Sequence, residues 1–204
     1  MVQIASIVSA FGLIAAAVAG PLVERQVTAP IIIGDVTYDG SGCPPGSIEV
    51  GNINFQTWEF ELFYKKLTTS IKGGDPKTKV KCQIRVPLKT VSNTQLVLLA
   101  GSYRGHVAIE KGVYAKQQNQ YKFDKNPGTT NMQWEFKGPM NASTTFTNEL
   151  AIEFQSGCSQ GGQFTLIINN YLTMTSEDGG SGSITVSELD AAVKQSVVLK
   201  SKAC

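Results

Sequence analysis

Apolar and polar side chains alternate without a break between Lys79 and Lys89. Because successive side chains of a strand point to opposite faces, a period of two predicts a β-strand with one buried and one solvated face. The buried face would carry Val80, Cys82, Ile84, Val86 and Leu88. A second alternation covers Thr57 to Tyr64. A chain with this pattern is expected to fold as sheets.

Further strands are predicted at 94–103, 106–116, 119–124, 130–136, 144–154, 163–174 and 196–202, with shorter ones at 31–33 and 48–50. Turns rich in Gly, Pro and Asn separate these segments, as at 73–76, 126–128 and 176–183. One short helix is a candidate at Ser187–Gln195. Many short alternating strands without a βαβ rhythm predict an all-β fold, a single antiparallel β-sandwich of roughly 8–10 strands with at most one short helix.

The first nineteen residues carry no charged side chain and end in Ala17-Val18-Ala19. Small residues at these positions after an apolar run predict a signal peptide at 1–19. A membrane anchor is the alternative, but Gly20-Pro21 and then Glu24-Arg25 follow too early for a span of about 20 apolar residues. We therefore expect a secreted, extracellular protein without stable membrane insertion. A loose leader is expected at 20–42, and the β-sandwich domain at 43–204.

Four cysteines lie beyond the predicted signal peptide: Cys43, Cys82, Cys158 and Cys204. In an oxidising compartment they predict two disulfides, with three pairings open. If 163–174 returned as a hairpin through 176–183, Cys158 would face roughly residue 201. That register favours a disulfide between Cys158 and Cys204, which leaves Cys43 and Cys82 to form the second disulfide. Asn141-Ala142-Ser143 is an N-glycosylation sequon, expected in a surface loop.

The composition excludes several functional classes. A net charge of +2 and a pI near 8.3 are too mild to predict nucleic-acid binding. With one histidine and no alternating carboxylates of a Ca²⁺ loop, we assign no metal, no cofactor and no catalytic residue. Two sets of residues offer a catalytic alternative. His106 could act as a general base on a strand, and Glu59 and Glu61 share one face as a carboxylate pair would.

The candidate ligand-binding residues are the cations on the solvated face of the first strand: Lys79, Lys81, Arg85 and Lys89. Such a row would bind an anionic polysaccharide or another acidic surface. The alternative is an edge strand whose lysines prevent pairing with other chains, which Pro87 would also suit.

Several sequence blocks occur in one order: GSGCPPGSIEV at 40–50, KCQIRVPL at 81–88, SYRGHVAIEKGVYA at 102–115, FKGP at 136–139, a cysteine before FTLIINNYLTM at 164–174, and a terminal cysteine. In these blocks the chain resembles the fungal secreted family catalogued as domain of unknown function 4360. The resemblance covers about residues 40–204. It implies secretion and a shared fold, and it implies no activity.

The sequence thus predicts a secreted extracellular protein, a non-catalytic binding protein of the cell surface, the cell wall or a host. Two alternatives stay open: a structural matrix component without a specific ligand, and a carboxylate-based hydrolase of wall polymers. The oligomeric state is not predicted.

Overall fold

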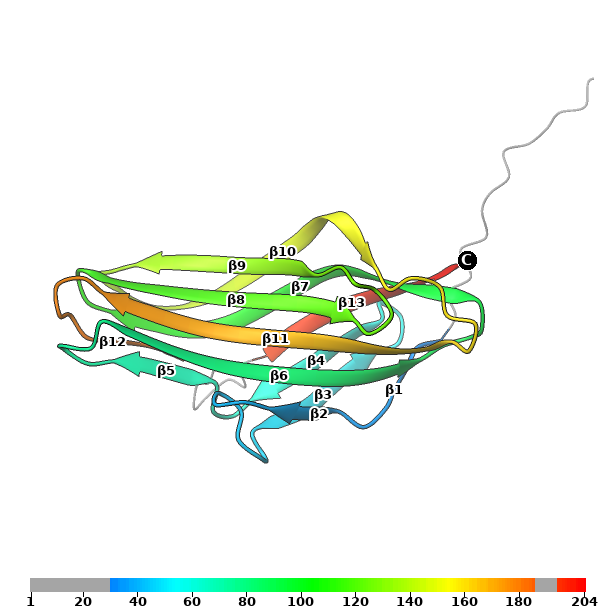
Figure 1. The fold of residues 1–204 in the computed structure, drawn as a ribbon, viewed down its shortest axis with the longest axis horizontal. Helices are drawn as coiled ribbons and strands as arrows, with labels where there is room; N and C mark the ends of the chain where they lie inside the picture. The colour runs from blue at the N-terminus through cyan, green and yellow to red at the C-terminus, as the bar shows by residue number, and fades with distance from the viewer. Residues whose placement is uncertain (1–29, 186–193) are drawn as a thin grey trace, which may run out of the picture.

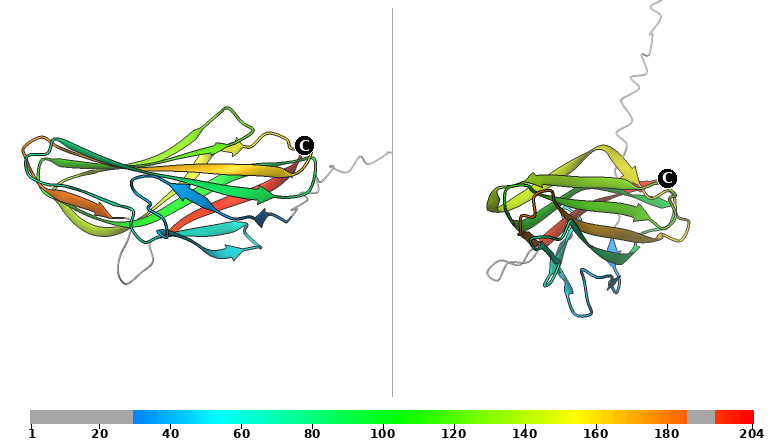
Figure 2. Two further views of the ribbon diagram at one scale, coloured as in Figure 1. Left: turned by 60° about the horizontal axis from the view of Figure 1, so that its bottom comes forward. Right: turned by 60° about the vertical axis from the view of Figure 1, so that its left-hand side comes forward.

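The computed structural model describes residues 30–185 and 194–204, which form two antiparallel sheets packed face to face (Figures 1 and 2). Every regular element in these two ranges is a strand. The strands are β1 (Ile32–Ile33), β2 (Thr37–Asp39), β3 (Ile48–Asn54), β4 (Glu59–Tyr64), β5 (Thr68–Ile71), β6 (Lys77–Lys89), β7 (Thr94–Ile109), β8 (Val113–Phe123), β9 (Thr130–Lys137), β10 (Met140–Gln155), β11 (Gln163–Ser176), β12 (Gly182–Thr185) and β13 (Lys194–Ala203). The antiparallel β-sandwich is confirmed, with more strands than the roughly 8–10 predicted.

Sheet A contains six strands in the order β1–β6–β11–β8–β9, with β2 also paired to β6. Strand β11 pairs with β6 at thirteen consecutive positions and with β8 at eleven, without a register shift. The strand predicted at 79–89 is confirmed as most of β6. Figure 1 shows β6, β11, β8 and β9 side by side in front of the second sheet.

Sheet B contains seven strands in the order β3–β4–β13–β7–β12–β5, and β10 pairs with the other edge of β7. Strands β12 and β13 share one edge of β7, because β12 pairs with its residues 106–109 and β13 with its residues 94–103. The ladder shifts register within β10–β7, β13–β7 and β3–β4. Sheet B is therefore less regular than sheet A.

The predicted breaks between strands at 103–106 and 116–119 are wrong. Strand β7 runs from Thr94 to Ile109 and β8 from Val113 to Phe123, and the chain turns between them at Gly112, whose φ is +79°. Gly101 lies inside β7, where an added Cβ would come within 2.8 Å of the Tyr121 hydroxyl oxygen. That glycine permits a close approach between the sheets and does not mark a turn.

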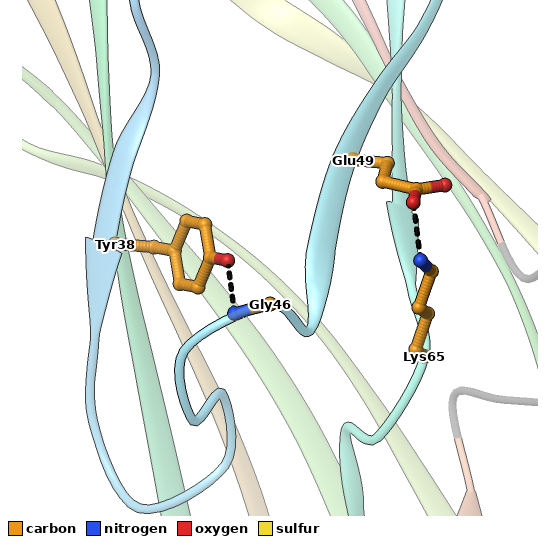
Figure 3. Close-up of polar contacts among 4 residues, drawn as sticks. All are labelled: Tyr38, Gly46, Glu49 and Lys65. Atoms are coloured by element: carbon orange, nitrogen blue, oxygen red, sulfur yellow. Dashed lines mark hydrogen bonds and ion pairs between the residues drawn. The ribbon is translucent and has the colours of Figure 1, made fainter.

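The segment predicted as a loose leader contains β1 and β2, and both pair with β6. The loop that follows is held by several contacts, among them a hydrogen bond of 2.9 Å from the Gly42 amide to the Lys81 carbonyl. The Gly46 amide donates to the Tyr38 hydroxyl at 2.7 Å (Figure 3). An ion pair between Lys65 and Glu49 joins β3 to the end of β4 nearby (Figure 3).

The disulfides are Cys43–Cys82 and Cys158–Cys204, with Cα–Cα distances of 5.3 and 6.0 Å. The pairing agrees with the prediction, but the hairpin behind it is wrong, because β11 pairs with β6 and β8. Cys204 instead reaches Cys158 through β7: Ala203 pairs with Thr94, and Thr94 bridges Ser159. Two disulfides fit the expected extracellular location.

The predicted signal peptide and residues 187–193 of the predicted helix lie outside the described residues. Of that helix, Lys194 and Gln195 belong to β13. Among the described residues, no helix is long and apolar enough to cross a membrane.

A polar network crosses the interior between the sheets. From sheet B, Tyr64 donates its hydroxyl hydrogen to the Gln195 side-chain oxygen at 2.5 Å. Asn170 of sheet A donates to the Tyr64 hydroxyl at 2.6 Å, and Gln195 of sheet B donates to the Tyr121 hydroxyl of sheet A at 2.7 Å. All four side chains are buried. Burial raises the pKa of Tyr64, Tyr103 and Tyr121 well above the ordinary tyrosine value, because a buried phenolate loses its hydration.

Candidate binding surface

The outer face of sheet A is a regular surface, because β11 pairs with β6 and with β8 without a register shift. Inward and outward positions alternate in burial along β6 and β8, and the register with these strands identifies the outward positions of β11. The register brings those side chains into rows that cross the sheet. One row contains Lys79, Thr173, Lys116 and Glu135, and the next contains Lys81, Tyr171, Gln118 and Gln133.

This face is strongly basic. On β6, β8, β9 and β11, which the structure describes in full, the outward positions carry five cations on β6, two on β8 and one on β9: Lys77, Lys79, Lys81, Arg85, Lys89, Lys116, Lys122 and Lys137. Glu135 is the one carboxylate among those positions, and it pairs with Lys116 at 3.3 Å. Alternate residues of a strand are about 6.5–7 Å apart, so neighbouring cations on β6 repel one another within a Debye length.

A row of side-chain amides crosses the middle of the face. Gln83 donates to the Asn169 oxygen at 2.8 Å, and Asn169 donates to the Gln120 oxygen at 3.3 Å. Arg85 donates from Nη2 to the Gln83 oxygen at 3.3 Å, so the row also orients the guanidinium. Amide side chains offer both donors and acceptors to a ligand with hydroxyl groups. The centre of the basic face can therefore form neutral hydrogen bonds as well as ion pairs.

Tyrosine rings lie among these cations. The Lys79 ammonium is 4.6 Å from the centroid of the Tyr171 ring, and the Lys137 ammonium is 5.6 Å from that of Tyr114. Such cation–π contacts hold a flexible lysine near one position. The face thus combines positioned cations, amides and aromatic rings.

The four predicted ligand-binding residues, Lys79, Lys81, Arg85 and Lys89, are all exposed on the outer face of β6. Strand β6 is not the edge of the sheet along its second half, since β1 and β2 pair there. Protection of an edge therefore does not account for Arg85 and Lys89. The cations of β8 and β9 were missed, although the alternation of Lys116, Gln118, Gln120 and Lys122 is visible in the sequence.

A depression of about 400 Å³ lies at the end of this face where β6 ends and β11 begins. Four separate segments form its walls: Ile32 and Gly34, Pro87 to Lys89, Asp124 and Lys125, and Gln163 to Thr165. In Figure 1 this end of β6 lies beside β1. A cavity of this size holds a small ligand.

The alternative catalytic residues lie on sheet B. Glu59 and Glu61 are half-buried neighbours on one face of β4, and neither lines the 400 Å³ depression. His106, on β7, is 3.0 Å through Nδ1 from the Ser143 hydroxyl. No described His, Cys, Asp and Glu side chains gather in a group of three or more that could hold a metal ion.

The prediction of a surface loop for the sequon is wrong. Asn141 is the second residue of β10 and pairs with Ala108 of β7, although its side chain is exposed. The local alternation was too weak to place the start of this strand.

The chain belongs to the DUF4360 family, described as a domain of unknown function, whose model matches residues 29–204. An uncharacterized secreted protein of Arthroderma benhamiae is 25% identical over 173 residues, which cover 83% of this chain and 70% of that protein.

Two solved structures show a weak overall similarity to this chain. The structure of TmCBM61 in complex with β-1,4-galactotriose is 10% identical, covers 83% of this chain and 88% of its own, and has a TM-score of 0.27. The enzymatically active domain of bacteriophage CBA120 tailspike protein 4 is 10% identical, covers 89% of this chain and 20% of its own, and has a TM-score of 0.22. Scores this low support no statement about ligands.

Proposed function

We propose that this protein is a secreted, non-catalytic binding protein whose ligand is an acidic polysaccharide, bound along the outer face of sheet A. The observation that carries the proposal is the arrangement of eight cations and one carboxylate on four regular strands. The chain as a whole has 18 basic and 16 acidic residues, so the charge is segregated rather than general. Segregated charge of one sign attracts a polyanion over a distance of about one Debye length.

A polysaccharide suits this face better than a compact anion. The cations of β6 follow one strand at intervals of two or four residues, so an extended ligand with repeated carboxylates can contact several of them together. Between the cations, the half-buried amides of Gln83 and Gln120, which the buried Asn169 holds in place, are positioned to hydrogen-bond to sugar hydroxyls. The predicted secretion and the secreted relative in Arthroderma benhamiae support an extracellular ligand of this kind.

Binding of polygalacturonate tests the proposal, with fully methyl-esterified polygalacturonate as the neutral ligand of the same backbone. The test variant is Lys79→Gln/Lys81→Gln/Arg85→Gln/Lys89→Gln. The matched control removes four cations away from this face: Lys66→Gln/Arg104→Gln/Lys200→Gln/Lys202→Gln. At about 0.5 kcal/mol for each of the four exposed contacts, about 2 kcal/mol in all, the test variant should bind roughly 30-fold more weakly at low salt.

The control should bind within about twofold of the wild type, and the neutral polymer should not compete. Equal losses in the two variants would show that only net charge matters, and the proposed site would be wrong. No binding by the wild-type protein would overturn the proposed function itself.

A further inference from the structure

The 400 Å³ depression at the end of the basic face has walls that are held in place. On one side, β1 pairs with the last residues of β6, and the Gly34 amide donates to the Pro87 carbonyl at 2.9 Å. On the other side, Asp124 and Thr165 hold each other by two hydrogen bonds. The Asp124 amide donates to the Thr165 carbonyl at 3.0 Å, and the Thr165 amide donates to the Asp124 carboxylate at 3.0 Å.

Lys125 closes the third side of the depression. Its ammonium donates to the Ser159 hydroxyl at 3.0 Å and to the Gln163 carbonyl at 2.8 Å, and it lies 5.6 Å from the centroid of the Phe164 ring. A side chain with three such contacts is fixed before any ligand arrives. The depression is therefore preorganised, which reduces the entropy lost when a ligand binds.

The lining has two chemical characters. Ile32, 61% exposed although apolar, and the ring of Pro87 offer an apolar surface. Lys89, Lys125 and Asp124 supply two positive charges and one negative charge, and Gln163 adds an amide. A ligand that fits must combine an apolar face, hydroxyl groups and a negative charge. A sugar ring that carries a carboxylate has all three, with its C–H groups forming the apolar face.

The depression also continues the basic face. Lys89 and Pro87 are the last outward residues of β6, and their partners Gln163 and Thr165 are the first outward residues of β11. Arg85 lies four residues before Lys89, about 13–14 Å along the strand. A chain bound along β6 would therefore reach the depression with one end.

We infer that the depression binds the terminal uronic acid unit of the polysaccharide, while the rest of the face binds the chain by charge. This inference rests on the proposed function and names the part of the ligand that each region recognises. Lys89 is placed to contact the carboxylate, Ile32 and Pro87 to pack against the sugar ring, and Asp124 to accept hydrogen bonds from hydroxyl groups.

Two ligands and two variants distinguish binding in the depression from binding along the rest of the basic face. The ligands are digalacturonate, too short to span the face, and long polygalacturonate. The pocket variant is Ile32→Ser/Lys89→Gln, and the face variant is Lys79→Gln/Lys81→Gln/Arg85→Gln. Calorimetry gives affinities, and the amide NMR signals of Gln163 and Thr165 report where digalacturonate binds.

The pocket variant should lose about tenfold or more of its affinity for digalacturonate, through one ion pair and one apolar contact. The face variant should bind digalacturonate as the wild type does and bind the polymer more weakly. The neutral dimer of galactose should bind more weakly than digalacturonate.

Three results would overturn the inference. Digalacturonate could fail to bind while the polymer binds, which would leave the proposed function standing without the pocket. It could bind the pocket variant unchanged. An acidic dipeptide could bind as tightly as digalacturonate, which would show that the pocket selects charge and not a sugar. If neither carbohydrate ligand binds the wild type, the proposed function fails together with the pocket.

Discussion

The two sheets have similar inner faces and very different outer faces. On sheet A the ladder is continuous, and the outward side chains form rows of cations and amides. On sheet B the register shifts in three places, and the outer face mixes Glu49, Glu59 and Glu61 with Arg104, Lys200 and Lys202. Folding constrains the inner faces of both sheets, because they must pack against each other. It leaves the outer faces free, so the eight cations and one carboxylate on the regular outer face of sheet A support the proposed binding site.

The largest expected effect concerns the interior that the two sheets share. Tyr64, Tyr103 and Tyr121 are buried and have raised pKa values, so the unfolded chain releases their protons at lower pH than the folded protein. Their contribution to stability is complete below the unfolded pKa of about 10 and is lost as the pH rises above it. With three such groups, the free energy of unfolding should fall by up to about 4 kcal/mol per pH unit.

Denaturant titrations between pH 9 and pH 11, followed by tryptophan fluorescence, measure this slope. Tyr121→Phe should lower the slope by about one third. A stability that stays constant over this range would show that the interior is open to water, and the contrast between inner and outer faces would lose its basis.

The next largest effect compares the two disulfides, which connect different parts of the sandwich. The separations of 39 and 46 residues predict similar losses of stability, about 4 kcal/mol each in the chain-entropy model. The structural consequences should differ. Without Cys43–Cys82, hydrogen exchange should increase along β6 and β2 of sheet A. Without Cys158–Cys204, it should increase in β13 of sheet B.

Paired Cys→Ala variants and hydrogen exchange with peptide resolution test this difference. The same pattern of exchange in both variants would mean that the sandwich opens as a whole, and that the regularity of sheet A does not depend on the loop at Cys43.

The sequence predicts the cations of the basic face that lie on one strand, but not those that come from strands far apart along the chain. The β6 cations were recognised because they alternate within one strand, and periodicity is a local signal. Lys116 and Lys122 join them only because β11 pairs with both β6 and β8. The depression has no local signal in the sequence, since residues near 32, 88, 124 and 164 form it.

The sequence pattern wrongly predicts two strands in place of β7, and this error has a different cause. Gly101 and Gly105 resemble turn residues, and only the packing of Tyr121 shows why a glycine is needed at 101.

Introducing one carboxylate on the outer face of each sheet, in separate variants, compares the contributions of the two faces to ligand affinity. Tyr171→Glu puts a carboxylate among Lys79, Lys81 and Gln118 and removes the ring that Lys79 contacts. Affinity for polygalacturonate at low salt should fall about tenfold. Ser102→Glu adds the same charge on the outer face of sheet B and should change the affinity by less than about twofold. Equal losses in the two variants would contradict a site confined to sheet A.

The smallest expected effect concerns the amide row on sheet A. Asn169 accepts a hydrogen bond from Gln83 and donates one to Gln120, so Asn169→Ala removes both and should reduce stability by about 0.5–1.5 kcal/mol. Asn131→Ala is the matched control. The Asn131 side chain accepts one long hydrogen bond of 3.4 Å from Gln118 on the same face. The stability of Asn131→Ala should therefore stay within about 0.5 kcal/mol of that of the wild type.

The two variants also differ in what they do to Arg85. Gln83 accepts a hydrogen bond from the Arg85 guanidinium and donates one to Asn169. Without the Asn169 side chain, Gln83 is held less firmly, and the Arg85 guanidinium becomes more mobile. Affinity for polygalacturonate should therefore fall two- to threefold in Asn169→Ala, about 0.4–0.7 kcal/mol, and should not change in Asn131→Ala. If Asn169→Ala lowered stability and left the affinity intact, the amide row would stabilise the sheet only. The basic face would then bind by charge alone, with no contribution from the orientation of Arg85.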